Sequence, residues 1–147
     1  MERTSRWTMP LLRISMGVFL LLWGVDKLLA AQGAGRIFSH FYHVPAGPVL
    51  VRAAAVLEIL VAICVAIGLF RRASAWAALV MSAASTIGSW KEILDPWGLL
   101  GLTTGGTHLF LASIPLTAVA VVLVLNASDD TLALDARLHR PSRPVSP

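Results

Sequence analysis

Residues 48–70 read PVLVRAAAVLEILVAICVAIGLF, an apolar run in which Arg52 and Glu58 carry the formal charges. A run of about 20 apolar residues fits the ~30 Å hydrocarbon core of a bilayer, where a helix satisfies its backbone polar groups internally. Such runs occur at about residues 9–30, 48–70, 74–94 and 107–126. The sequence therefore predicts an all-α fold class, a transmembrane four-helix bundle built from residues 1–126.

The composition of the whole chain also favours a membrane location. Of its 147 residues, 56% are hydrophobic and 14% are charged, whereas ordinary soluble domains are about 25% charged. This balance excludes a secreted disulfide scaffold, a disordered chain and a nucleic-acid-binding module, so the expected partner is the lipid bilayer. The one cysteine, Cys64, excludes disulfide-generating chemistry within the chain.

Positive charges are distributed unevenly between the predicted loops. One side holds Arg3, Arg6, Arg71, Arg72, Arg137, Arg140 and Arg143. The opposite side holds Arg36. By the positive-inside rule we expect a multi-pass protein of the cell membrane with both termini cytoplasmic and a cytoplasmic tail over residues 127–147. The first run is longer than the ~7–15 residues of a signal-peptide core, so we interpret it as a retained span.

Glu58 is the strongest candidate for a functional residue, because it lies ~15 Å into its span, where an ionisable group needs a partner or a role. One face of the first span carries, at helical spacing, Arg13, Gly17, Leu20, Gly24 and Lys27. Small residues at the middle of this face, and alanines at positions 54, 62 and 66, favour close packing of the two helices. Arg13 or Lys27 can then reach Glu58; the alternative is that both cations extend to the interfaces.

We predict Glu58, Arg13 and Lys27 as catalytic residues, the carboxyl exchanging a proton and a cation stabilising negative charge. Polar residues nearer the outer surface predict a cavity that opens outward. The predicted ligand-binding residues are Asp26, Arg52, Ser85, Ser89, Trp90 and His108. The serines of the third span also suit helix–helix packing, which is the interpretation we favour for that stripe. The histidines match no ligand signature, so no metal site is predicted and haem is not expected.

Several segments resemble DoxX-type small integral membrane proteins. They are RISMG at 13–17, WGVDKL at 23–28, VLEI at 56–59, IGLFRR at 67–72 and LALDARL at 132–138. The resemblance implies a four-helix bundle and kinship with the small membrane subunit of a thiosulfate:quinone oxidoreductase. It also implies that Arg13, Lys27 and Glu58 fall on the polar positions of the family.

The resemblance and the buried polar residues leave three hypotheses open. The first is a subunit or accessory of a membrane redox system that handles a quinone or a small reductant such as a sulfur compound. Its cofactor would be a quinone and its partner another redox-enzyme subunit. The second is a non-enzymatic assembly partner of membrane proteins, and the third is a small-solute or proton pathway that would need a homo-oligomer. The sequence leaves open whether the protein is an enzyme.

Overall fold

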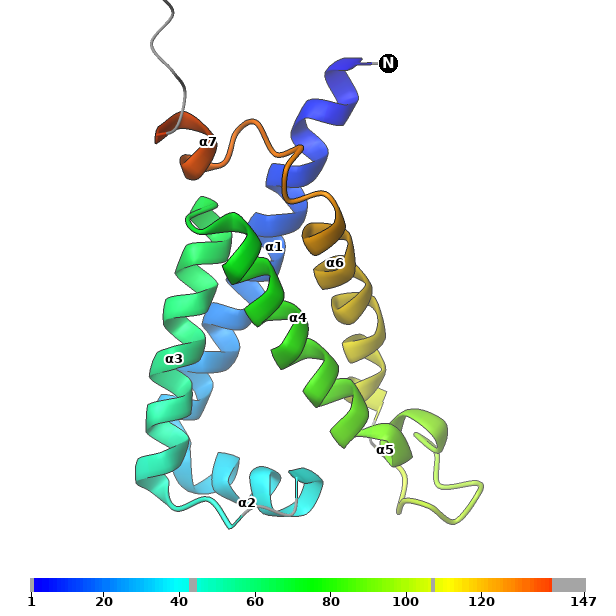
Figure 1. The fold of residues 1–147 in the computed structure, drawn as a ribbon. Helices are drawn as coiled ribbons and strands as arrows, with labels where there is room; N and C mark the ends of the chain where they lie inside the picture. The colour runs from blue at the N-terminus through cyan, green and yellow to red at the C-terminus, as the bar shows by residue number, and fades with distance from the viewer. Residues whose placement is uncertain (1, 43–44, 107, 139–147) are drawn as a thin grey trace, which may run out of the picture.

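The computed structural model describes residues 2–42, 45–106 and 108–138, and all regular structure within these ranges is helical (Figure 1). The elements are α1 (Glu2–Leu29), α2 (Ala31–Tyr42), α3 (Pro48–Ile67), α4 (Arg71–Gly88), α5 (Trp90–Leu94), the 3-10 helix η1 (His108–Ala112), α6 (Ser113–Leu125) and α7 (Leu134–Leu138). The all-α prediction is therefore confirmed for the described part of the chain.

Three segments of the described chain are long and apolar enough to cross a membrane: Trp7–Leu29, Pro48–Ile67 and His108–Leu125. They coincide with three of the four predicted spans, so the protein is a multi-pass membrane protein. The predicted span 74–94 is divided at Ser89 into α4 and α5. Helix α4 is less apolar than the three segments because it contains two arginines and four hydroxyl side chains. A fourth crossing therefore stays a prediction.

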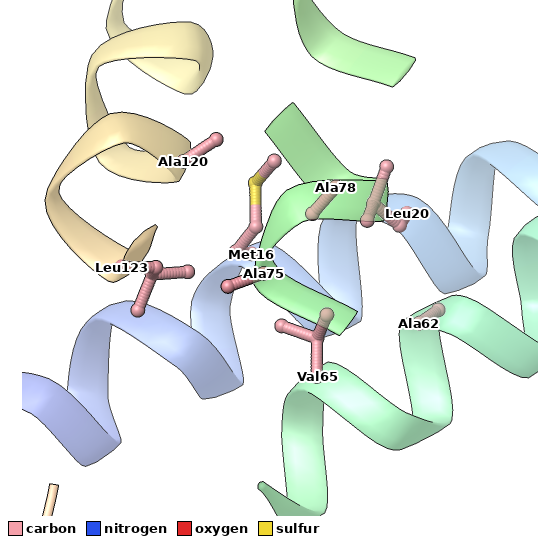
Figure 2. Packing of buried hydrophobic residues seen from close by; sticks show 8 residues of the cluster. All are labelled: Met16, Leu20, Ala62, Val65, Ala75, Ala78, Ala120 and Leu123. Carbon is pink, nitrogen blue, oxygen red and sulfur yellow. The ribbon is translucent and has the colours of Figure 1, made fainter. Parts of the chain in front are cut away.

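Four helices contribute to the main hydrophobic core (Figure 2). Its buried members are Met16 and Leu20 of α1, Ala62 and Val65 of α3, Ala75 and Ala78 of α4, and Ala120 and Leu123 of α6. Half of these side chains are alanines, which bring helix backbones close together and leave little space to fill. Met16, with its flexible thioether, lies among them at 1% exposure.

The turn from α3 to α4 is tight and depends on Gly68. Gly68 caps α3 in the left-handed conformation, with φ at +73°. A Cβ at this position would clash with Nη1 of Arg13 and would lie 2.7 Å from the Cβ of Ala133. Glycine is therefore required both by the backbone conformation and by the close approach of two other segments.

Residues 126–138 fold back over this turn, as Figure 1 shows for α7. The amide of Asp135 donates to the carbonyl oxygen of Gly68 at 3.2 Å. We call the end formed by residues 68–74 and 126–138 the tail end, and the end formed by α2, α5 and residues 95–106 the loop end. The cytoplasmic location of the tail stays a prediction, and Arg140 and Arg143 lie outside the described residues.

Candidate functional site

Helices α1 and α3 approach each other closely at two glycines of α1. A Cβ at Gly17 would lie 2.7 Å from the Cβ of Ala66 and 2.8 Å from the carbonyl oxygen of Ala62. A Cβ at Gly24 would lie 2.7 Å from Cγ1 of Ile59. The predicted small-residue face of α1 therefore packs on α3, and the contact leaves no room for a larger side chain.

This packing brings together Lys27 near the end of α1 and Glu58 in the middle of α3. The Lys27 Nζ lies 2.5 Å from the Glu58 Oε2, and the two side chains are 19% and 7% exposed. The ammonium also lies 6.0 Å from the ring centroid of Trp23, within the range of a cation–π contact. Lys27 is therefore the partner of the buried Glu58 carboxylate. This is one of the two contacts predicted from the sequence, in which Arg13 or Lys27 reaches Glu58.

Arg13 has a different partner. Its Nη1 lies 3.0 Å from Oδ2 of Asp130, and its Nη2 donates to the carbonyl oxygen of Leu132 at 3.2 Å. Arg13 and Lys27 are about 21 Å apart along α1, so one carboxylate cannot serve both. The predicted alternative in which Arg13 reaches Glu58 is therefore wrong, and Arg13 instead holds the C-terminal segment.

Four of the six predicted ligand-binding residues are exposed rather than buried in the bundle. Asp26, Arg52 and Trp90 are exposed. His108 is also exposed, and its ring lies edge-on to Trp97 at a centroid distance of 5.7 Å. Two cavities of the described chain lie instead at the tail end, so an outward-opening cavity stays a prediction.

The hydroxyl side chains of α4 hold helices together. Thr86 Oγ1 lies 2.8 Å from Oγ1 of Thr117 and donates to the carbonyl oxygen of Ser113 at 3.2 Å. Ser89 is buried and donates to the carbonyl oxygen of Ser85 at 2.7 Å. The Thr86 contacts link α4 to α6, and Ser89, the residue after α4, bonds to the last turn of that helix. The contacts of Thr86 agree with the packing role favoured from the sequence.

The structure also shows polar residues that the sequence did not single out as sites. Asp130 partners Arg13, and Asp135 accepts a hydrogen bond from the amide of Arg71 at 2.8 Å. Both lie after the last apolar run, where a carboxylate is common and signals nothing by itself. A useful signal was Arg13, a cation near the end of an apolar helix that requires a partner.

Asp95 is another buried carboxylate, placed directly after α5. Its Oδ2 accepts hydrogen bonds from the amides of Leu102 at 2.9 Å and Thr103 at 3.4 Å. Burial acts to raise the pKa of this carboxyl, but hydrogen bonds from the backbone of residues 99–103 outweigh it and hold the pKa below its ordinary value. This carboxylate is satisfied by backbone amides, whereas Glu58 and Asp130 are paired with cations.

Within the part of the chain that the structure describes, no group of three His, Cys, Asp or Glu residues is placed to hold a metal ion. His43 lies outside the described residues. His40 lies beside a carboxylate, with its Nε2 3.8 Å from Oε1 of the buried Glu92. Cys64 is half-buried in α3. The Lys27–Glu58 pair remains the strongest candidate site, because its carboxylate is buried and because it joins two candidate membrane helices.

The model of the DoxX family matches residues 8–90, more than half of the chain. The chain belongs to the DoxX family. No curated protein and no solved structure matches it. The matched residues of this DoxX-family protein contain Arg13, Lys27 and Glu58, whereas Asp130 and Asp135 lie beyond them. The resemblance of residues 132–138 to the family therefore stays a prediction.

Proposed function

We propose that this DoxX-family protein is a subunit or accessory of a membrane redox system that handles a quinone or a small reductant such as a sulfur compound. The observation that carries the proposal is the Lys27–Glu58 pair, which joins two candidate membrane-spanning helices. Its Nζ and Oε2 atoms are 2.5 Å apart. A charged pair at such a position is costly in lipid. Its presence in an otherwise apolar contact favours a role beyond packing.

The chemistry available to this pair is proton exchange. The Glu58 carboxylate can take up a proton from water and pass it to a reduced quinone oxygen, and the neighbouring ammonium stabilises the carboxylate that is restored or the developing oxyanion. The sequence has no cysteine pair and no dinucleotide-binding fingerprint. Electrons would therefore come from the small reductant itself or from the cofactor of a partner subunit.

The proposal also includes four crossings with both termini cytoplasmic. Helix α3 ends at the tail end, whereas η1 and α6 start at the loop end (Figure 1). A crossing by α4 is consistent with this arrangement, because its 18 residues extend about 27 Å. A reporter protein that is active only in the cytoplasm should be active when it is fused after Pro147. Activity at the same position of a reporter that works only outside the cell would contradict this orientation.

A quinone-reduction assay tests the redox proposal. The full chain in lipid nanodiscs, with its co-purifying proteins, is given a short-chain quinone and thiosulfate, and quinone reduction is followed by absorbance. Loss of general acid catalysis in Glu58→Gln should lower the rate about 100-fold or more. Glu92→Gln, which removes another buried carboxylate at the loop end, serves as the matched control. Equal rates in wild type and Glu58→Gln would remove Glu58 from the mechanism.

A second function, a non-enzymatic assembly partner, is supported by a separate observation. The buried Arg13 and the half-buried Lys27 of α1 are both neutralised within the chain. Large apolar side chains of α1, α4 and α6 are exposed, among them Leu22, Val80 and Leu125. Such faces suit lipid or the helices of another membrane protein. If this is the function, deleting the gene should lower the abundance of a co-purifying redox enzyme. Glu58→Gln should leave the turnover of that enzyme unchanged.

A further inference from the structure

We propose that the larger of the two tail-end cavities binds the phosphate-bearing headgroup of an anionic phospholipid. The cavity has a volume of about 620 Å³, within the range of ligand pockets. It lies between the α3–α4 turn and the segment that follows α6. Its principal lining residues are Phe70, Arg71, Arg72, Ser128, Thr131 and Asp135. This inference is independent of the proposed redox function, because the cavity lies at the opposite end of α1 from Lys27.

The depth of the cavity matches that of lipid headgroups. Two candidate spans end nearby, one at Ile67 and one at Leu125. The cavity lining begins three residues after each of these ends, at Phe70 and Ser128. Since a span ends where hydrocarbon gives way to headgroups, both sides of the cavity lie at the level of lipid phosphates.

The charge of the lining suits a phosphate. Two arginines and one aspartate line the cavity, which leaves a net positive charge. Arg71 is held in place, because its Nη1 donates to the carbonyl oxygens of Ser128 at 3.3 Å and Asp130 at 3.2 Å. Asp135 is already engaged by the Arg71 amide at 2.8 Å. Arg72 is exposed, and its planar guanidinium is well suited to bind phosphate oxygens.

Phe70 favours a lipid over a free phosphate ion. Its side chain lines the cavity and is 65% exposed. A soluble anion gains nothing from this apolar surface, whereas the glycerol and upper acyl chain of a lipid can pack against it. The lining therefore combines a cationic part, which suits the lipid phosphate, with an apolar part, which suits the glycerol and the upper acyl chain.

Lipid retention measured by native mass spectrometry tests the proposal. The full chain is reconstituted with equal parts of phosphatidylglycerol and phosphatidylcholine, and the lipids that remain bound after detergent exchange are counted. Wild type should retain phosphatidylglycerol in preference to phosphatidylcholine. Arg72→Gln should retain about fivefold less of it, the effect of one basic residue near a membrane surface.

Two further variants make the result decisive. Ala73→Glu adds a carboxylate to the cavity in the first turn of α4, where an acidic residue favours the helix, so it should lower retention without unfolding the protein. Arg36→Gln removes an exposed arginine of α2 at the loop end and should retain as much phosphatidylglycerol as wild type. Equal retention in all four proteins, or equal loss in Arg36→Gln and Arg72→Gln, would overturn the proposal.

The source of the phosphate is tested in the same samples. Millimolar inorganic phosphate should leave the bound phosphatidylglycerol in place, because it lacks the apolar part that contacts Phe70. Complete displacement by inorganic phosphate in wild type would show that the cavity binds the free ion, and this result would overturn the lipid assignment.

Discussion

The two ion pairs of helix α1 hold the molecule together in different ways. At the loop-end half of α1, Lys27 pairs with Glu58 of the helix that packs directly against it. At the tail-end half, Arg13 pairs with Asp130, which belongs to the segment after α6. The first pair joins two membrane helices at a close contact, whereas the second fastens a terminal segment to the bundle.

The difference shows how position changes the role of a buried charge. Glu58 lies inside a candidate span and depends on one cation. Asp130 also accepts a hydrogen bond from the amide of Leu132 at 3.1 Å, and it lies beyond the last span. Losing the cation should therefore cost more at Glu58 than at Asp130.

The largest effect is expected from Lys27→Met. This change keeps the length and the apolar stem of the side chain but leaves the Glu58 carboxyl unpaired within the helix contact. Removing one partner of a buried pair costs about 3–5 kcal/mol. Denaturant unfolding in micelles should show this loss. A cost as small as that of Arg13→Met would contradict the stronger dependence of Glu58 on its cation.

A smaller loss of stability is expected from Gly17→Val, which puts a larger side chain into the α1–α3 contact. Gly17 lies between Arg13 and Lys27 along α1. The added atoms would meet Ala66 and the backbone oxygen of Ala62, and overpacking of this kind costs about 1–3 kcal/mol. Thermal unfolding of the purified protein measures the loss. Gly33→Val is the matched control, because a Cβ at Gly33 meets nothing within 4 Å. An unchanged melting temperature in Gly17→Val would contradict the close approach of α1 and α3.

Arg13→Met should act locally. Asp130 loses its cation but keeps the Leu132 amide, and the loss is expected to be about 1–2 kcal/mol. The segment 126–138 should become sensitive to protease while α1 and α3 stay protected. Protection of that segment equal to wild type would show that Arg13 does not fasten it.

The smallest effect is expected at Asp95, a carboxylate held by backbone amides. Because its folded pKa lies below the ordinary value, its stabilising contribution is present above the ordinary aspartate pKa of about 3.9 and is lost as pH falls through the lower folded value. Hydrogen exchange at the amides of Leu102 and Thr103, corrected for intrinsic rates, should accelerate below about pH 4. Asp95→Asn should exchange rapidly without this pH step, and pH-independent protection in wild type would refute the assignment.

The α1–α3 contact could be predicted from the sequence because glycines and cations recur on one face of an apolar run, a pattern typical of closely packed membrane helices. One detail differed. Ala54 was predicted in the contact, but Ala55 is the buried residue, and its carbonyl oxygen faces Gly24. Three consecutive alanines at positions 53–55 do not reveal which one faces the neighbouring helix.

The tail-end contacts could not be predicted in the same way. Asp130 and Asp135 lie in a polar segment where carboxylates are ordinary, and their partners are more than 60 residues away along the chain. Hydropathy also overestimated the continuity of residues 74–94, because it does not register the break at Ser89. Long-range pairs of this kind depend on how the helices are arranged, which the sequence pattern alone does not specify.

A double-mutant cycle tests whether Lys27 and Glu58 form a coupled pair between α1 and α3. The free energy of unfolding is measured for wild type, Lys27→Met, Glu58→Leu and the double variant in the same micelles. We expect the double variant to recover much of the loss, with a coupling energy of about 2 kcal/mol. Additivity of the two single changes within about 0.5 kcal/mol would contradict it.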